Sequence, residues 1–418
     1  MLLSPLAFNF KNMHYKIVAP ATLKGTIKLP ASKSISNRVL ILNALSDSPF
    51  EVQNVAECDD TQVMLNVLDS DDNHFDIKAA GTAMRFLTAF LSKILGEWII
   101  SGTERMKNRP IRILVDAINQ LGGKIEYIEK EGYPPLRIFG SALTGGELDL
   151  DGSVSSQYIS ALLMIAPTME KGLTLRLQGE VISQAYISMT LKLLEEFGVK
   201  SSWNGNVIRI QSQEFIPREY TVESDWSAAS YWYEMVALSN DAEVELIGLH
   251  KNSTQGDSKV ADIFSQLGVK TTYTKEGVKL TKTGSVTPKL IYNFVDQPDL
   301  AQTFVVTCCM LGIPFYFNGL QTLKIKETDR ILALKNEMKK LGFMIADKKD
   351  SILEWNGERC SPDSDAAIAT YEDHRMAMAF APAALKLDSI TIAEPQVVSK
   401  SYPLYWENLK SVGFEVTE

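Results

Sequence analysis

The sequence lacks the cysteine spacing that marks a metal or redox site. Its four cysteines form no C-x-x-C pair, and two of them, Cys308 and Cys309, lie inside the apolar run TFVVTCCMLG. A buried free cysteine usually serves as a small apolar residue. We therefore predict that the cysteines, including Cys58 and Cys360, are reduced core residues rather than metal or redox groups.

Long apolar runs and a surplus of positive charge are also missing. No segment offers about 18 uncharged apolar residues in succession, as a membrane-spanning helix requires. The short run LLSPLAF has no basic residue before it and no small-residue cleavage signal after it. We expect a cytoplasmic protein with no membrane partner. The formal net charge of −9 argues against nucleic acid, which selects a basic face, but allows a small anionic substrate if cations gather locally.

What the sequence does contain is an ordinary globular composition, with 45% hydrophobic and 22% charged residues. A chain of 418 residues exceeds the size at which one hydrophobic core stops growing, so we expect about two domains.

A repeated phrase gives these domains an internal structure. An amphipathic helix ends at a glycine and a short strand follows at once, at Gly122, Gly198, Gly268, Gly342 and Gly413. The copies lie about 70 residues apart, a longer period than that of solenoid repeats. Glycine at these positions fits a left-handed helix C-cap. A sixth copy, which begins with the predicted strand 49–55, lacks the glycine. We predict an α/β fold of two domains with three strand–helix–strand units each.

Two short segments rich in proline or charge, KLPAS and REYTVES, suggest where the domains divide. We predict that residues 1–31 and 225–418 form one discontinuous domain. Residues 32–224 would form the inserted domain, and the two chain crossings would act as a double hinge.

Basic and hydroxyl residues gather where predicted strands pass into helices. In LPASKSISNR, Lys33 and Arg38 lie at a helix start, where unpaired N–H groups and the helix dipole favour an anion. AAGTAMRFL repeats this design with Gly81 and Arg85, and SSQ (155–157) and ISQAY (182–186) supply hydroxyl groups. Ordinary N-caps explain each of these segments about as well.

The segment RMKNRPIR carries four basic residues and no acidic one in an acidic chain. Charge runs usually lie on solvated faces. Pro110 stiffens the loop, however, which favours a positioned arginine at Arg109.

The second half of the chain adds acidic residues beside cations. Asp299 precedes a helical apolar run, and in KIKETDRI the spacing predicts Lys326 and Arg330 on one helix face, close to Glu327. An N-cap aspartate and a surface ion-pair helix are the alternatives. YEDHRMAMAF brings Asp373, His374 and Arg375 to a further helix start.

Jointly, these segments put eight cations at loop-to-helix junctions of different repeats, where open α/β units gather ligands. The eight are Lys33, Arg38, Arg85, Arg109, Lys326, Arg330, Arg375 and Lys400. Such a set predicts one or two substrates with several negative charges.

Taken together, these segments resemble those of a known family. LPASKSISNR, AGTAMR, RMKNRPI, SSQ, KETDR and DHRMAM match, in order, the signature segments of the enolpyruvyl transferase family, in particular of the 5-enolpyruvylshikimate-3-phosphate synthases. The resemblance implies two domains of three βαβαββ units each, an inside-out α/β barrel, with the active site in the cleft between them. It also implies transfer of the enolpyruvyl group of phosphoenolpyruvate to the 5-hydroxyl of shikimate 3-phosphate. No metal or organic cofactor is implied, and we expect a monomer.

The resemblance further implies a role for each matching residue. Expected catalytic residues are Asp299, Glu327, Lys33 and Lys326. Expected contacts to shikimate 3-phosphate are Ser34, Arg38, Ser155, Ser156, Gln157, Ser183, Tyr186 and Thr322. Expected contacts to phosphoenolpyruvate are Gly81, Thr82, Arg85, Arg109, Arg330, His374, Arg375 and Lys400.

Three positions depart from the family pattern. Ala79 and Thr322 stand where asparagine is usual, and Phe86 replaces a common proline. Two alternatives remain open. One is the sister enzyme that acts on UDP-N-acetylglucosamine, whose pattern has a lysine–asparagine pair and a reactive loop cysteine that this chain lacks. The other is a non-catalytic anion-binding protein of the same fold, against which the presence of both Asp299 and Glu327 argues.

Overall fold

The computed structural model describes residues 13–364 and 366–418, which form two compact units. The terminal unit holds the described residues up to Pro30, together with Trp226–Lys251 and Asp257–Glu418. The inserted unit holds Ala31–Asp225 and Asn252–Gly256. Within the described part of the chain, none of the helices has the length and apolar character of a membrane span.

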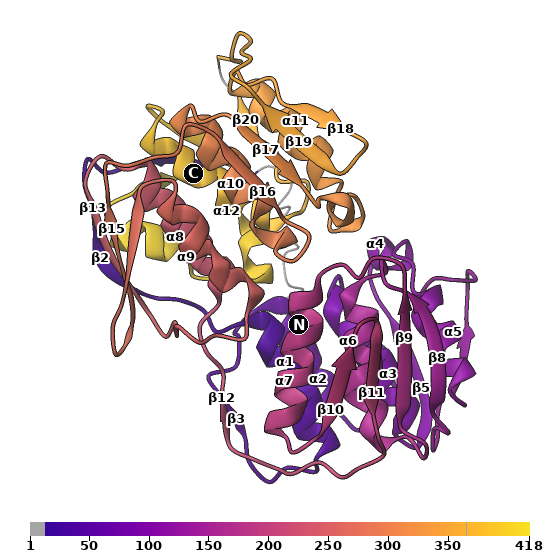
Figure 1. The fold of residues 1–418 in the computed structure, drawn as a ribbon. Helices are drawn as coiled ribbons and strands as arrows, with labels where there is room; N and C mark the ends of the chain where they lie inside the picture. Colours follow the sequence, from indigo (N-terminus) through magenta and orange to yellow (C-terminus); the bar gives the residue numbers. More distant parts are fainter. Residues whose placement is uncertain (1–12, 365) are drawn as a thin grey trace, which may run out of the picture. The chain divides into compact units, whose positions relative to one another are not determined.

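The inserted unit alternates helices and strands (Figure 1). Its helices are α1 (Lys33–Leu45), α2 (Asp59–Leu68), α3 (Gly81–Lys93), α4 (Glu104–Lys107), α5 (Arg112–Gln120), α6 (Ser156–Ile165) and α7 (Gln184–Glu196). Its strands are β3 (Val52–Gln53), β4 (His74–Asp76), β5 (Gly96–Ser101), β6 (Lys124–Tyr127), β7 (Leu136–Gly140), β8 (Gly146–Asp151), β9 (Leu173–Gln178), β10 (Ser201–Asn204), β11 (Val207–Ile210) and β12 (Tyr220–Thr221).

The terminal unit has the same character. Its helices are α8 (Trp226–Leu238), α9 (Val260–Ser265), α10 (Ala301–Leu311), α11 (Arg330–Lys340), α12 (His374–Phe380) and α13 (Tyr405–Ser411), with short 3-10 segments η4 (Pro298–Leu300), η5 (Gln321–Ile325) and η7 (Pro395–Lys400). Its strands are β1 (His14–Val18), β2 (Leu23–Lys28), β13 (Ala242–Ile247), β14 (Val269–Tyr273), β15 (Gly277–Lys282), β16 (Leu290–Asn293), β17 (Phe315–Asn318), β18 (Ala346–Lys348), β19 (Ile352–Trp355), β20 (Ala367–Ile368), β21 (Ile390–Ala393) and β22 (Glu415–Thr417).

The four-stranded sheets share one topology. In the sheet β4-β5-β7-β6, β4 and β5 are parallel, and β7 pairs antiparallel with both β5 and β6. The sheets β8-β9-β11-β10 and β16-β17-β19-β18 repeat this order. The predicted α/β fold of repeated βαβαββ units is therefore confirmed.

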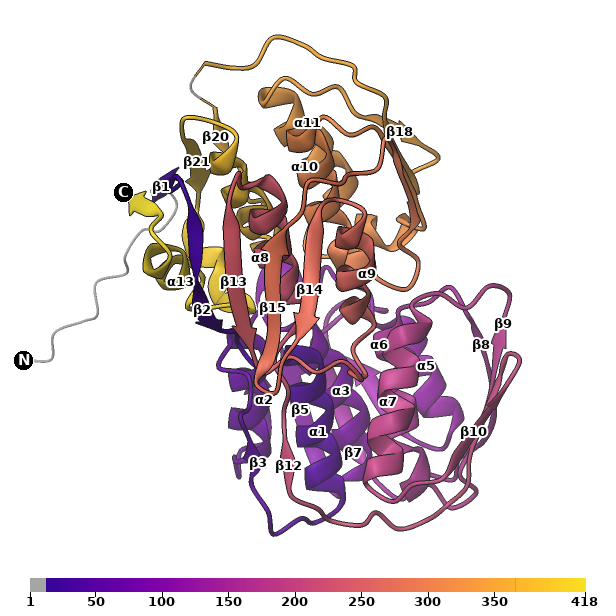
Figure 2. The ribbon, with the colours of Figure 1, turned by 60° about the vertical axis from the view of Figure 1, so that its left-hand side comes forward.

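The N-terminal strands complete two of the repeats. Strand β2 pairs in parallel with β13, with Leu23 opposite Ala242, and β1 lies between β21 and β22 (Figure 2). The sixth repeat is reduced, because among the described strands β3 pairs only with β12. The strand predicted over 49–55 is shortened to Val52–Gln53 for this reason.

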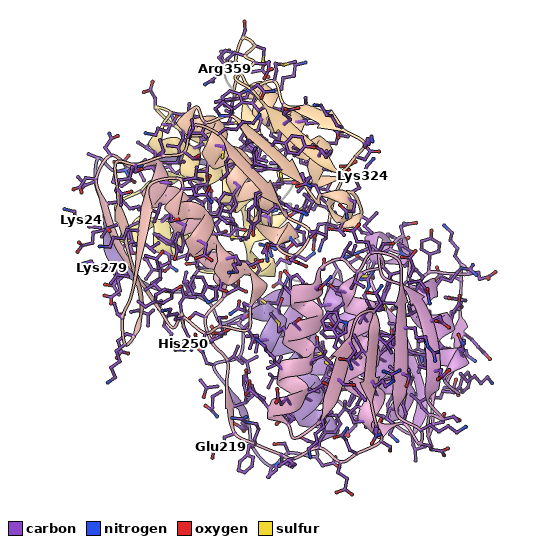
Figure 3. All side chains as sticks on the ribbon, in the orientation of Figure 1. Lys24, Glu219, His250, Lys279, Lys324 and Arg359 are labelled. Atoms are coloured by element: carbon purple, nitrogen blue, oxygen red, sulfur yellow. The ribbon has the colours of Figure 1, made fainter. Side chains whose placement is uncertain are left out.

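The sheets place one face on the helices and the other in solvent. Alternate residues of β13 are buried, as a half-buried strand requires. On the same sheet, Lys24 and Lys279 lie on the outer face and pair with surface carboxylates (Figure 3). Such exposed pairs contribute little to stability.

Three core helices fill the middle of each unit: α1, α3 and α6 in the inserted unit, and α8, α10 and α12 in the terminal unit. Their starts lie level. The Gln157 amide at the start of α6 donates to the Thr82 hydroxyl at the start of α3, over 3.1 Å. Arg375 at the start of α12 donates to the carbonyl of Asp299, just before α10, over 3.3 Å.

The third helix of each unit starts at the same level. Arg38, near the start of α1, donates to Ser160 of α6 over 3.1 Å, and the hydroxyls of Ser230 in α8 and Thr303 in α10 lie 3.2 Å apart. Each unit therefore presents three helix N-termini at one end.

The predicted glycine caps are confirmed. Gly122, Gly198, Gly268, Gly342 and Gly413 have φ between 82° and 98°, in the left-handed region that glycine alone adopts without strain. In the reduced repeat, α2 ends instead at Asp69, in a right-handed conformation.

Replacing Gly342 with alanine should destabilise the terminal unit. Gly342 has φ +88°, and an added Cβ would lie 3.1 Å from the carbonyl oxygen of Cys360. We expect Gly342→Ala to lower the free energy of unfolding by about 1–2 kcal/mol, measured by urea denaturation. Gly284→Ala is the matched control, because its Cβ meets nothing within 4 Å. Equal shifts in the two variants would contradict this account of the cap.

Candidate active site

The terminal unit holds a buried cluster of carboxylates and cations centred on Arg330. This arginine opens α11 and is 1% exposed. Its guanidinium contacts Asp373 over 2.7 Å, Glu327 over 2.9 Å and Asp299 over 3.1 Å. Burial alone would lower the pKa of Arg330, but the surrounding carboxylates raise it. Arg330 is therefore always charged and holds the three carboxylates together.

Asp299 lies in η4, immediately before α10, and is not an N-cap. Its side chain pairs with Arg330, with Arg375 over 3.0 Å and with Lys326 over 3.8 Å. Burial alone would raise the pKa of Asp299, but Arg375, Lys326 and Arg330 lower it well below its ordinary 3.8. The carboxylate is ionised in this state.

Glu327 pairs with two cations from different segments. One oxygen accepts from Arg330 and the other lies 3.2 Å from Nζ of Lys400, at the end of η7. The prediction that Lys326 and Arg330 share one helix face is wrong, because α11 begins only at Arg330, with Asp329 as its N-cap. Lys326 and Glu327 lie in the preceding turn.

Arg375, in the first turn of α12, is fixed by several groups. Besides Asp299, its guanidinium donates to the Tyr231 hydroxyl over 3.3 Å, and its backbone N–H donates to Asp373 over 2.9 Å. Burial raises the pKa of Tyr231 to about 12, so this phenol is neutral. His374 is buried beside Asp373, with Nδ1 3.7 Å from a carboxylate oxygen.

In the inserted unit, Lys33 opens α1 after the N-cap Ser32. Its Nζ lies 3.4 Å from the buried carboxylate of Asp60, and its backbone N–H donates to Asp225 over 3.3 Å. Asp60 thus limits where the ammonium group can lie.

Arg38, one turn further along α1, is 2% exposed. It donates to Thr190 over 2.8 Å, to Ser160 over 3.1 Å and to the carbonyl of Ser34 over 2.8 Å. Burial lowers the pKa of Arg38 to about 10, so the arginine stays charged at neutral pH.

Two aromatic rings flank the Arg38 guanidinium, Phe86 at 5.2 Å and Tyr186 at 5.9 Å. Phe86, which stands where the family usually has proline, therefore lies beside Arg38 and adds a cation–π contact there.

The basic segment 105–112 divides into different roles. Lys107 pairs with Glu129 and Arg112 with Glu131, both at the surface. Arg109 instead lies against Gly81, so closely that a Cβ at position 81 would be 2.4 Å from its Nη1. Of these three cations, only Arg109 lacks a carboxylate partner among the described residues.

Hydroxyl residues gather beside these cations. The segments that carry Ser155 and Ser183 lie side by side, because the N–H of Ile182 donates to the carbonyl of Gly152 over 3.1 Å. Ser155 caps α6, and Ser183 precedes α7 with φ 54°. Ser156 and Gln157 occupy the first turn of α6.

The structure thus brings the predicted residues into one set per unit. Asp299, Lys326, Glu327, Arg330, His374, Arg375 and Lys400 belong to the set of the terminal unit. Thr322 lies in η5, and its hydroxyl is buried with no hydrogen-bond partner among the described residues. The remaining predicted residues belong to the inserted unit.

Sequence reasoning missed several partners that orient these residues. Asp60, Tyr231, Thr190 and Ser160 were not predicted. Only Asp60 left a signal, since the acidic pair in CDDTQ lies at a predicted helix start. The sequence places Asp373 at a helix start but gives no sign that it pairs with Arg330.

The fold and these two sets of residues define a class, an α/β protein of repeated units that gathers cations, carboxylates and hydroxyls at helix starts to bind anionic substrates. Comparison with known proteins makes this specific. Residues 17–70 and 68–409 match the family model described as EPSP synthase (3-phosphoshikimate 1-carboxyvinyltransferase). The chain belongs to the EPSP synthase family.

The relatives agree with this assignment, and a solved structure shares the fold. The chain is 57% identical over 405 residues to the 3-phosphoshikimate 1-carboxyvinyltransferase of Bacteroides fragilis, covering 97% of this chain and 99% of the relative. It is 36% identical over 419 residues to that of Yersinia pseudotuberculosis, covering 93% and 96%. The structure of EPSP synthase from Acinetobacter baumannii has a similar fold, with a TM-score of 0.77 at 22% identity, covering 97% of this chain and 100% of that one.

The lowered pKa of Asp299 predicts a specific loss of stability in acid. A carboxylate whose folded pKa lies below 3.8 contributes stability above about pH 3.8, and this contribution is lost as the pH falls through the folded pKa. Asp299→Asn should therefore be less stable at neutral pH, by a few kcal/mol on the order of a broken buried pair. Its free energy of unfolding should also fall less steeply below about pH 4.

Urea denaturation between neutral pH and about pH 3 measures both effects. Asp241→Asn, which removes a carboxylate that is 62% exposed, is the control. A slope in acid that matches the wild-type slope would show that Asp299 is not held ionised by its neighbours.

Proposed function

We propose that this protein transfers the enolpyruvyl group of phosphoenolpyruvate to the 5-hydroxyl of shikimate 3-phosphate and releases phosphate, a step of aromatic amino-acid biosynthesis. The observation that carries the proposal is the pair of carboxylates, Asp299 and Glu327, held on one buried arginine with Lys326, Arg375 and Lys400 around them. Family membership supports the same reaction. The alternative substrate, UDP-N-acetylglucosamine, is not favoured, because the relatives named above are 3-phosphoshikimate enzymes.

Shikimate 3-phosphate is proposed to bind at the helix starts of the inserted unit. Ser155, Ser156 and Ser183 receive its phosphate, since the neighbouring N-termini of α6 and α7 supply backbone donors. Ser34 and Arg38 receive its carboxylate. Tyr186 lies near the phosphate, Gln157 lies beside the ring, and Thr322 is at the position that contacts a ring hydroxyl.

Phosphoenolpyruvate is proposed to bind through its two charged groups. Lys33, Arg109 and Lys400 hold the phosphate, and Arg330 with Arg375 holds the carboxylate, which the planar guanidinium groups suit. Gly81, Thr82, Arg85 and His374 line this pocket. The close approach of Arg109 to Gly81 supports this role, because the arginine is held in place without a carboxylate partner.

The chemistry needs one group that first gives and later takes a proton. Glu327 protonates the methylene carbon of phosphoenolpyruvate, and the 5-hydroxyl attacks the adjacent carbon while Asp299 accepts the hydroxyl proton. Glu327 then removes a methyl proton as the C–O bond to phosphate breaks. Lys33 and Lys326 stabilise the charge that develops on the phosphate and at the hydroxyl.

Binding of the anionic substrates changes the proton affinity of Asp299 and Glu327. In this state Asp299 and Glu327 occupy the guanidinium and ammonium groups that the substrate is proposed to use. When the substrate carboxylate and phosphate take over part of these contacts, both side chains lose positive neighbours and their proton affinity rises. Binding therefore lets Glu327 carry the proton that it first donates, and it makes Asp299 a better base.

One active site is proposed to draw on both units, in a cleft that closes around the two substrates. We also propose that the protein acts as a monomer. The free cysteines suit the reducing cytoplasm, the proposed location.

Phosphate release tests the reaction directly. The purified protein should release inorganic phosphate when both substrates are present, and should release none when either one is omitted. Release from phosphoenolpyruvate alone, or no release with both substrates, would refute the proposal.

Glu327→Gln should lower kcat by at least about a hundredfold, because the variant loses the group that transfers the proton. Its affinity for shikimate 3-phosphate, measured by calorimetry, should stay close to that of the wild type. Glu243→Gln, at an exposed surface pair, is the control and should keep full activity. Normal turnover in Glu327→Gln would remove this residue from the mechanism.

Gly81→Ala should weaken phosphoenolpyruvate binding selectively. The added methyl would lie 2.4 Å from Nη1 of Arg109 and must displace the guanidinium. We expect KM for phosphoenolpyruvate to rise about tenfold or more, the loss of one charge-assisted hydrogen bond. KM for shikimate 3-phosphate should be unchanged. Gly284→Ala serves as the control, and an equal rise in both KM values would argue for a general distortion instead.

A further inference from the structure

We infer that Tyr158 is a positioning residue for Arg109, an inference that rests on the proposed function, in which Arg109 binds the phosphate of phosphoenolpyruvate. The Tyr158 hydroxyl donates to the carbonyl oxygen of Pro110 over 2.5 Å. Tyr158 is 7% exposed and lies in the first turn of α6. Its hydroxyl thus holds the backbone next to Arg109.

The backbone decides where the Arg109 guanidinium lies. Within the described residues, this side chain has no recorded ion pair or hydrogen bond, and it lies against Gly81. A side chain without polar partners keeps its place only if its Cα is fixed and its path is confined. Gly81 confines the path, and the contact to Pro110 fixes the chain one residue away.

The Tyr158 hydroxyl makes the shorter of two contacts to the Pro110 carbonyl. Arg85 also points at the Pro110 oxygen, but over 3.5 Å, at the limit of a hydrogen bond. The guanidinium of Arg85 makes its shorter bond, of 2.8 Å, to the carbonyl of Gly81. Proline has no N–H, so the carbonyl is the one backbone group by which Pro110 can be held.

Helix α6 connects this anchor to the other substrate. Gln157, beside Tyr158, donates to Thr82 in α3, and Ser155 and Ser156 begin the same helix. The start of α6 therefore holds residues for shikimate 3-phosphate and, through Tyr158, aligns the cation for phosphoenolpyruvate.

Steady-state kinetics of the full chain test the inference. Tyr158→Phe keeps the ring and its packing and removes only the hydroxyl. KM for phosphoenolpyruvate should rise about three- to tenfold, the range for one lost neutral hydrogen bond. KM for shikimate 3-phosphate, kcat and the melting temperature should stay close to wild type.

Tyr127→Phe is the matched control. Tyr127 belongs to the same unit, and its buried hydroxyl has no hydrogen-bond partner among the described residues. This variant should leave both KM values unchanged. An unchanged KM for phosphoenolpyruvate in Tyr158→Phe, an equal rise for both substrates, or the same rise in Tyr127→Phe would overturn the inference.

A double-mutant cycle with Arg109→Lys separates this inference from the proposed function. Lysine cannot reproduce the forked contact of arginine, so Arg109→Lys alone should raise KM for phosphoenolpyruvate. Tyr158→Phe should then raise KM for phosphoenolpyruvate by a smaller factor in the Arg109→Lys variant than in the wild type. If Tyr158→Phe raised KM by the same factor in both backgrounds, the positioning role would be overturned and the proposed function would stay intact. No effect of Arg109→Lys would refute the proposed role of Arg109, and the inference with it.

Discussion

The arrangement of the whole protein depends on helices that are apolar on nearly every side. Such helices must be covered all round, so α1, α3 and α6 fill one unit, α8, α10 and α12 fill the other, and the sheets form the outer layer. Because the starts of the core helices lie level, their unpaired N–H groups and positive dipole ends gather at one end of each unit. The candidate site residues lie at or beside these starts.

Electrostatic balance explains why the buried charges of the terminal cluster are stable together. A buried arginine is costly unless carboxylates compensate for its lost hydration, and Arg330 has three of them. Two of these carboxylates also neutralise Arg375 and Lys400. An anionic substrate at this cluster would replace protein carboxylates rather than meet bare cations. The affinity would then be lower than the number of cations suggests, and the displaced carboxylates would become available for proton transfer.

The sequence predicted the repeat well because its signals are local. A glycine that ends a helix needs a left-handed backbone whatever surrounds it, and all five such glycines have that conformation. The reduced repeat was harder to predict, because β3 pairs with β12 near residue 220. Neither segment carries a local signal that identifies its partner. The helix predicted through Lys326 was too long for a different, local reason, because α11 begins only after its N-cap at Asp329.

The sequence by itself determined the repeat, the α/β class and the family, because periodicity, glycine positions and ordered motifs survive in the linear order of residues. Only the tertiary structure decided which cation of the segment 105–112 lies against Gly81, and which partners orient Lys33 and Arg375. These contacts join residues far apart in the chain, and their geometry follows from packing of the core helices. Local propensities do not determine that packing.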